Sequence, residues 1–204
     1  MHGFRINIFV RCEYLKKLIN GSNAVVSEML SGMAKAFPAL AYDPKYAVIS
    51  RAHKPVGKVG LVSGGCSGHG PAHAGYVGEG MLDAAVSGNV FASPDPEKVL
   101  TAIRLADSGK GVLLVIKNYS GDVMNFEMAA ELAAMEGIDI QTVVVHDDVA
   151  VADSTFSTGR RGIAGTVFVH KIAGAKAESG ASLTDVQAVA QKVVSNVRSM
   201  GMSM

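Results

Sequence analysis

The sequence predicts an α/β protein with a mostly parallel sheet that is covered by helices on both faces. Two observations support this class: residues 58–63, 112–116 and 140–145 are apolar along their whole length, and helical patterns separate them. Strands that are apolar throughout are typical of parallel sheets buried on both faces. The 23 glycines are spread between these segments, as expected for many tight turns.

The helices of the first half follow from apolar spacing and from cap residues. Residues 22–37 place apolar side chains at helical intervals after Ser22, which is a candidate N-cap. A second helix is predicted over residues 93–109, with Ser93 as its candidate N-cap, prolines near its start and Gly109 at its end.

The second half continues the alternation. Residues 122–137 predict a helix between the second and third strands, closed by a glycine. Residues 147–165 predict a loop, and two further helices are predicted over residues 166–180 and 183–199, the latter capped by Ser182.

Composition excludes several classes of function. The 19 basic and 18 acidic side chains leave a net charge of +1, so no charge excess points to nucleic acid or to an anionic membrane. Only Cys12 and Cys66 occur, which is typical of a reducing compartment. The apolar stretch at residues 6–10 is too short for a signal peptide or a membrane span. We expect a cytoplasmic protein.

Polar side chains follow each predicted strand. Ligands of open α/β sheets bind outside the carboxyl ends of the strands. If the three strands are parallel neighbours, five side chains face one crevice: His69, Lys117, Asp122, Asp147 and Asp148. The two adjacent aspartates would point in opposite directions, so only one of them can line the crevice.

The loop "SGGCSGHGPAH", residues 63–73, has three competing interpretations. It matches neither a Walker A motif nor G-x-G-x-x-G, so nucleotide binding is unsupported. Residues 65–69 differ from the nucleophile-elbow pattern G-x-S-x-G at one position, because His69 replaces the last glycine. Ser67, His69 and Asp122 would be the members of a catalytic triad in that interpretation. A Cys66/His69 pair is conceivable. The remaining interpretations are a plain turn and a backbone cradle for a small polar ligand, with His69 exchanging protons.

Simpler roles are also available for the other candidates. Lys117 can extend its ammonium group to water from the end of a strand, and Asp122 can cap the helix that follows. No metal site is predicted. The remaining candidates are assigned structural or solvent-facing roles: His146, Arg160, Arg161 and His170.

Long motifs resemble one known family. "LVSGGCSGHGPAHAGYVGEGML", "VLLVIKNYSGDVMNFEMAAELA" and "VVVHDDVAVADSTFSTGRRGIAGTVFVHKIAGA" are similar to the dihydroxyacetone-binding subunit of dihydroxyacetone kinases, from about residue 15 onward. The resemblance implies a homodimer that binds dihydroxyacetone for phosphorylation and carries no cofactor. It also implies that the nucleotide, ADP or ATP with Mg, is held by a helical partner subunit served by a phosphotransferase-system protein, or by a fused domain.

The resemblance also implies roles for individual residues. The cradle of the family maps onto Cys66, Ser67, Gly68 and His69. His69 and Asp122 correspond to the acid/base groups, and Lys117 to a lysine that hydrogen-bonds the substrate.

Two departures from the family pattern lie in the loop. Cys66 replaces a glycine and Gly70 replaces a glutamate. If residue 66 has a positive φ, a cysteine there costs about 1 kcal/mol or more.

Other departures lie at the two ends. The family continues beyond residue 204 into a second domain, with a histidine that forms a covalent hemiaminal; no histidine here matches it, so we expect weak binding and low turnover. Leu15 stands where the family begins with methionine, so residues 1–14 are expected to be an extension and residues 15–204 the domain. A non-catalytic triose-binding or regulatory module stays open as the alternative function.

Overall fold

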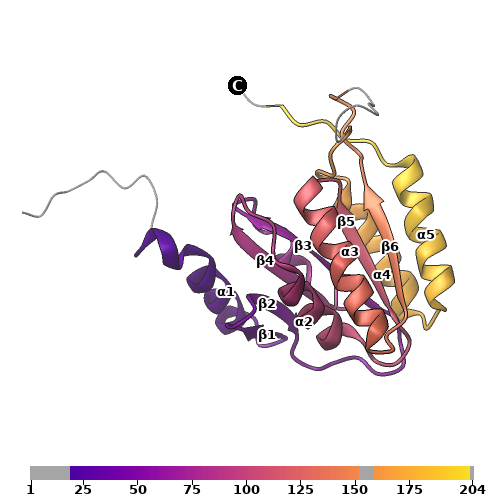
Figure 1. The fold of residues 1–204 in the computed structure, drawn as a ribbon, viewed down its shortest axis with the longest axis horizontal. Coiled ribbons are helices and arrows are strands. Elements are labelled where there is room, and N and C mark those ends of the chain that lie inside the picture. The colour runs from indigo at the N-terminus through magenta and orange to yellow at the C-terminus, as the bar shows by residue number, and fades with distance from the viewer. Residues whose placement is uncertain (1–18, 152–158, 203–204) are drawn as a thin grey trace, which may run out of the picture.

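The computed structural model describes residues 19–151 and 159–202, and it confirms the predicted α/β class. Within these residues one six-stranded sheet has the order β1-β2-β4-β3-β5-β6 (Figure 1). The strands are β1 (Leu40–Asp43), β2 (Val48–Arg51), β3 (Gly60–Ser67), β4 (Ala84–Val90), β5 (Val112–Lys117) and β6 (Ile140–Val145). The last four are mutually parallel, whereas β1 and β2 pair antiparallel at one edge. The expectations for Cys12 and Leu15 lie outside the described residues.

Helices cover both faces of this sheet, as predicted. They are α1 (Val25–Ala36), α2 (Pro96–Ala106), α3 (Ser120–Met135), α4 (Thr166–Glu178) and α5 (Leu183–Asn196). Alternate residues of β5 enter two separate cores: Leu113 packs with α1, α4 and α5, whereas Leu114 packs with α2 and α3. Among the described residues, no helix is both long and apolar enough to cross a membrane.

Some elements differ from the prediction. The predicted strands correspond to β3, β5 and β6, but β4 was missed because its sequence, AAVSGNV, is poor in β-branched and aromatic residues. Two predicted N-caps are wrong. Ser22 begins a short 3-10 turn without a side-chain cap bond, and Asp95 rather than Ser93 caps α2. Ser182 caps α5 as predicted.

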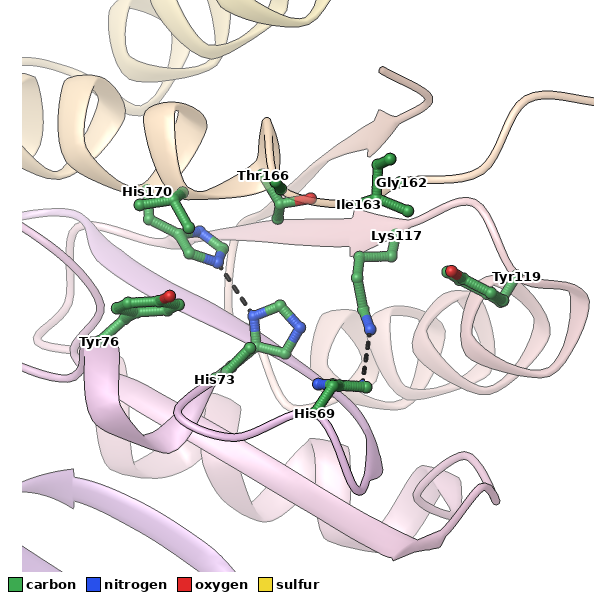
Figure 2. A pocket seen from close by; sticks show the side chains of 12 residues that line it. His69, His73, Tyr76, Lys117, Tyr119, Gly162, Ile163, Thr166 and His170 are labelled. Carbon is green, nitrogen blue, oxygen red and sulfur yellow. Dashed lines mark hydrogen bonds between the residues drawn. The ribbon is translucent and has the colours of Figure 1, made fainter. Parts of the chain in front are cut away.

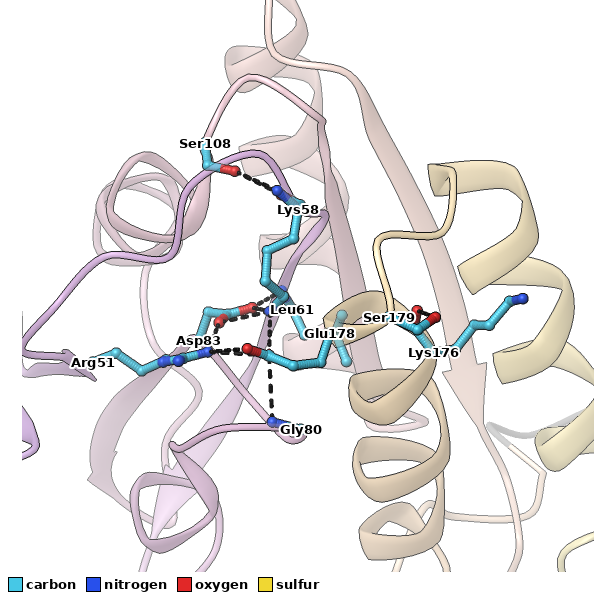
Figure 3. Close-up of polar contacts among 9 residues, drawn as sticks. All are labelled: Arg51, Lys58, Leu61, Gly80, Asp83, Ser108, Lys176, Glu178 and Ser179. Atoms are coloured by element: carbon cyan, nitrogen blue, oxygen red, sulfur yellow. Dashed lines mark hydrogen bonds and ion pairs between the residues drawn. The ribbon is translucent and has the colours of Figure 1, made fainter.

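A cluster of four charges, with Lys58 and Asp83 buried and Arg51 and Glu178 partly buried, joins β2, the segments before β3 and β4, and the end of α4 (Figure 3). The Asp83 carboxylate lies 2.7 Å from Lys58 Nζ and 3.2 Å from Arg51 Nη1, and it also accepts the Leu61 backbone N–H. Glu178 lies 3.1 Å from both cations. The two positive and two negative charges balance, which is the condition for keeping such groups out of water.

Candidate functional site

The carboxyl ends of β3 and β5 bring two predicted site residues into contact. Lys117 is the last residue of β5, and His69 follows the end of β3 by two residues. Because the strands are parallel neighbours, their loops leave the same edge of the sheet. Lys117 Nζ lies 3.1 Å from His69 Nε2 (Figure 2). The predicted convergence of these two loops is present in the structure.

Asp122 joins this pair from the first turn of α3, at a place that Gly65 leaves open. Gly65 has a φ of +151°, and a Cβ on it would lie 3.1 Å from Asp122 Oδ2 and 3.2 Å from Lys117 Nζ. The carboxylate is buried, with Asp122 only 2% exposed. Tyr119 is the N-cap of α3, so the interpretation of Asp122 as that cap is wrong. We call His69, Lys117 and Asp122 the polar cluster.

Burial governs protonation in the polar cluster. Burial lowers the pKa of His69, and the positive charge of Lys117 lowers it further. Burial also lowers the pKa of Lys117, with partial compensation from Asp122. The pKa of Asp122 is raised by burial, against a hydrogen bond from Ser93 and the charge of Lys117. A lysine ammonium group can only donate, so His69 Nε2 must accept and the neutral ring carries its proton on Nδ1. His69 therefore presents a basic nitrogen.

Cys66 adopts an ordinary backbone conformation. Gly65 and Gly68 have positive φ values, but Cys66 is not among the positive-φ residues of the described chain. The strain considered for a cysteine at this position is therefore absent. Cys66 Sγ lies 3.4 Å from His69 Nε2, so the fold brings together a pair whose contact the three-residue spacing could not guarantee.

Ser67 points away from the polar cluster. Its buried hydroxyl donates to the Gly88 carbonyl oxygen of β4 at 2.7 Å. A hydroxyl held in the sheet cannot act as an exposed nucleophile, which favours the cradle over acyl transfer.

A cavity of about 320 Å³ extends from the polar cluster toward α4 and reveals two residues that sequence reasoning missed. His69 and Lys117 line it together with His73 and His170, whose Nδ1 and Nε2 atoms lie 3.1 Å apart (Figure 2). Burial lowers the pKa of His170 to about 3 and that of His73 well below its ordinary value, so both rings are neutral at physiological pH. The structural role expected for His170 did not anticipate its place in the cavity wall. Because 97 residues separate the pair, only the fold could show it.

The two aspartates after β6 point to different partners, as their adjacency predicts. Asp147 is buried and accepts the backbone N–H groups of Ile163 and Gly165 at 2.9 and 2.7 Å. Asp148 accepts the N–H of Ala150. Neither lines the cavity, but Asp147 fixes the segment at 162–165, part of which does. The expected position of an aspartate in the crevice is therefore corrected to a supporting one.

Replacement of Gly65 by alanine is expected to disrupt the polar cluster. The new methyl group would press on Asp122 and Lys117, and the φ of +151° is unfavourable for alanine. We expect the affinity of this site for a small polar ligand, measured by calorimetric titration, to fall at least about tenfold, which is equivalent to about 1.4 kcal/mol. Gly70→Ala in the same loop is the matched control, because a Cβ there meets nothing within 4 Å. Equal losses in both variants would contradict this role of Gly65.

The described residues hold no group of three or more His, Cys, Asp or Glu side chains placed to bind a metal ion. The polar cluster instead offers hydrogen bonds and proton transfer to a small polar molecule.

Comparison with known proteins shows which family has this sequence and this fold. The Dak1 domain model matches residues 31–204. The PTS-dependent dihydroxyacetone kinase 1, dihydroxyacetone-binding subunit DhaK, of Listeria innocua is 55% identical over 191 residues, which are 93% of this chain and 58% of that protein. The DhaKLM operon coactivator DhaQ of Lactococcus lactis is 40% identical over 188 residues, 92% of this chain and 57% of that protein. The crystal structure of the dihydroxyacetone kinase of C. freundii superimposes with a TM-score of 0.83 at 43% identity, covering 89% of this chain and 34% of that one.

The fold and the cavity define a class: a mostly parallel α/β domain with a polar cavity at the carboxyl ends of its central strands. The chain belongs to the Dak1 family. It spans somewhat more than half the length of the two curated relatives named above.

Proposed function

We propose that this chain binds dihydroxyacetone and presents it for phosphorylation to dihydroxyacetone phosphate. The observation that carries the proposal is the meeting of His69, Lys117 and Asp122 beside one cavity in a chain of the Dak1 family. The Listeria relative is named a dihydroxyacetone-binding subunit. Because this chain spans 58% of that relative, the activity of the complete protein is part of the proposal.

The polar cluster supplies what a hydroxyl needs in order to accept a phosphoryl group. The attacking hydroxyl must lose a proton, and His69 Nε2 and the Asp122 carboxylate are the acid/base groups that can take it. Lys117 donates a hydrogen bond to the substrate, and the loop backbone at Cys66, Ser67 and Gly68 forms the cradle. Part of His69 is open to solvent even though its Nε2 atom packs against Lys117, so a phosphoryl donor can approach from the open side.

The phosphoryl donor belongs to a partner in this proposal. The glycine loop lacks a Walker A pattern, and we assign ADP or ATP with Mg to a helical kinase subunit. The Listeria relative is named a PTS-dependent kinase subunit, which supports a phosphotransferase-system protein as the source of phosphate. We also propose that the protein is a homodimer in the cytoplasm.

A coupled assay tests the proposed function. The chain is mixed with the helical nucleotide subunit, the phosphotransferase components and dihydroxyacetone, and formation of dihydroxyacetone phosphate is followed through NADH oxidation by glycerol-3-phosphate dehydrogenase. We expect product only when this chain is present, and less of it with Lys117→Met. Product formation at the same rate without the chain, or none with it, would overturn the kinase role.

The pH dependence of phosphorylation is expected to reflect the shifted groups. Catalysis requires neutral His69 and ionised Asp122. Burial lowers the pKa of His69 from its ordinary 6.5 and raises that of Asp122 from its ordinary 3.8. As the pH falls below 6.5, kcat/KM should therefore decrease, and the decrease should begin before the pH reaches 3.8. A pH profile of the coupled assay checks this. An acid limb centred above pH 6.5 would contradict the lowered pKa of His69.

A regulatory module is the second candidate, favoured by one observation. The Lactococcus relative is named an operon coactivator and matches 92% of this chain. A regulatory module would bind dihydroxyacetone in a calorimetric titration yet yield no phosphate ester in the coupled assay. Binding together with turnover would exclude it.

A further inference from the structure

Cys66 has the surroundings of a reactive thiol. It is partly exposed at the end of β3, and its Sγ lies 3.4 Å from His69 Nε2. The same nitrogen lies 3.1 Å from Lys117 Nζ. The thiolate is the reactive form of cysteine, and a neighbouring base or cation favours it. The base is in place here, because His69 Nε2 carries no proton while Lys117 donates to it.

A second feature shows that small molecules have a place to bind beside this thiol. The Asp122 carboxylate lies beside Gly65, the neighbour of Cys66: its Oδ2 atom would be 3.1 Å from a Cβ on Gly65, and its Oδ1 atom is buried without a hydrogen-bond partner among the described residues. A buried acceptor of this kind calls for a donor from a ligand or from water. The cavity is lined by His69, whose Nε2 contacts the Cys66 sulfur, and by Lys117.

We propose that Cys66 is a modification site, oxidised by small hydroperoxides with His69 as the base, and that its oxidation closes the dihydroxyacetone site. The first part stands on the geometry alone, whereas the second part rests on the proposed function. Because a glycine occupies this position in the family pattern that the sequence resembles, the sensitivity would be a property of this chain.

The chemistry balances with the hydroperoxide as the only co-reactant. Lys117 turns away from His69 Nε2, the freed lone pair of this nitrogen takes the Cys66 proton, and the sulfur attacks the distal peroxide oxygen. An S–O bond forms, the O–O bond breaks, and the leaving oxygen takes the proton from the imidazolium ring as water or an alcohol. The sulfur loses two electrons, the peroxide gains them, and the product is a sulfenic acid that thiol reductants reverse. The added oxygen lies beside the basic nitrogen that the substrate hydroxyl requires.

The test measures the rate of Cys66 oxidation by hydrogen peroxide, with dimedone trapping of the sulfenic acid and peptide mass analysis. A Cys12→Ser chain isolates the single thiol. We expect Cys66 to react at least about tenfold faster in the native chain than in the urea-unfolded chain, a difference that a base of this kind can supply. His69→Gln should remove the advantage, and saturating dihydroxyacetone should slow the native rate. Equal rates in the native and unfolded chains, a comparison that needs no His69 variant, would overturn the proposal.

The functional consequence has its own readout. Peroxide treatment should abolish calorimetric binding of dihydroxyacetone in proportion to the fraction of Cys66 that peptide mass analysis finds oxidised, and dithiothreitol should restore it. Unchanged binding by chain that is fully oxidised at Cys66 would overturn the closing of the site. If untreated chain does not bind dihydroxyacetone, the proposed function fails, but the oxidation rates still decide whether Cys66 is the modification site.

Discussion

Replacement of Asp122 by asparagine is expected to lower kcat for dihydroxyacetone phosphorylation by about 100- to 10,000-fold, the range associated with loss of an acid/base group. The amide keeps the size of the side chain and can still bond to Ser93, but it cannot take a proton. Because burial raises the pKa of Asp122, the native carboxylate is a better base than an ordinary aspartate. The coupled assay with the helical nucleotide subunit measures the effect.

The matched control for Asp122→Asn is Glu127→Gln on the same helix. Glu127 is exposed on α3, and its change also removes one carboxylate charge. We expect near-normal kcat for this control. A loss of similar size in both variants would show that the effect of Asp122→Asn comes from net charge rather than from the site, and an active Asp122→Asn enzyme would remove Asp122 from the acid/base role.

Asp83→Asn is expected to cost about 3–5 kcal/mol of unfolding free energy, because it leaves buried Lys58 and partly buried Arg51 with Glu178 as their one remaining carboxylate in the cluster. Asp83 is the centre of the charge cluster, with its side chain 1% exposed and bonded to Lys58, Arg51 and the Leu61 backbone N–H. The amide removes the negative charge but hardly changes the volume. Urea unfolding followed by circular dichroism measures the difference.

The control for Asp83→Asn is Glu136→Gln, which breaks the exposed ion pair with Arg104. Exposed pairs contribute little because water and salt screen them. We expect its urea midpoint to match that of the unaltered chain. A small effect of Asp83→Asn, equal to that of Glu136→Gln, would show that the buried cluster is not a major source of stability.

The sequence predicted three of the four parallel strands, but not β4 or the antiparallel strands β1 and β2. β3 and β5 are mainly apolar on both faces because each is buried between two helical layers, and the run of valines in the partly buried β6 gives a similar local pattern. β4 is equally central, but Ala84, Ser87 and Gly88 carry no strand signal of their own. β4 forms because strands on both sides pair with it, and such pairing is a tertiary effect.

The polar cluster was predictable for a related reason, whereas its surroundings were not. Lys117 ends a recognisable strand, and His69 and Asp122 each follow one within a few residues, so the rule for parallel sheets places them together. Ser93 reaches Asp122 from the loop after the unpredicted β4, and its sequence context indicated an N-cap. The absence of strain at Cys66 depends on its φ value, and its contact with His69 depends on the orientation of its side chain. Neither property has a sequence signal.

We infer that dihydroxyacetone binds at the carboxyl ends of β3 and β5. A titration of the ¹⁵N-labelled chain with dihydroxyacetone, followed by amide chemical shifts, tests this location. We expect saturable shifts concentrated at residues 65–70 and 117–122, which Lys117→Met weakens. Saturable shifts centred elsewhere on the chain, or none at millimolar dihydroxyacetone, would contradict it.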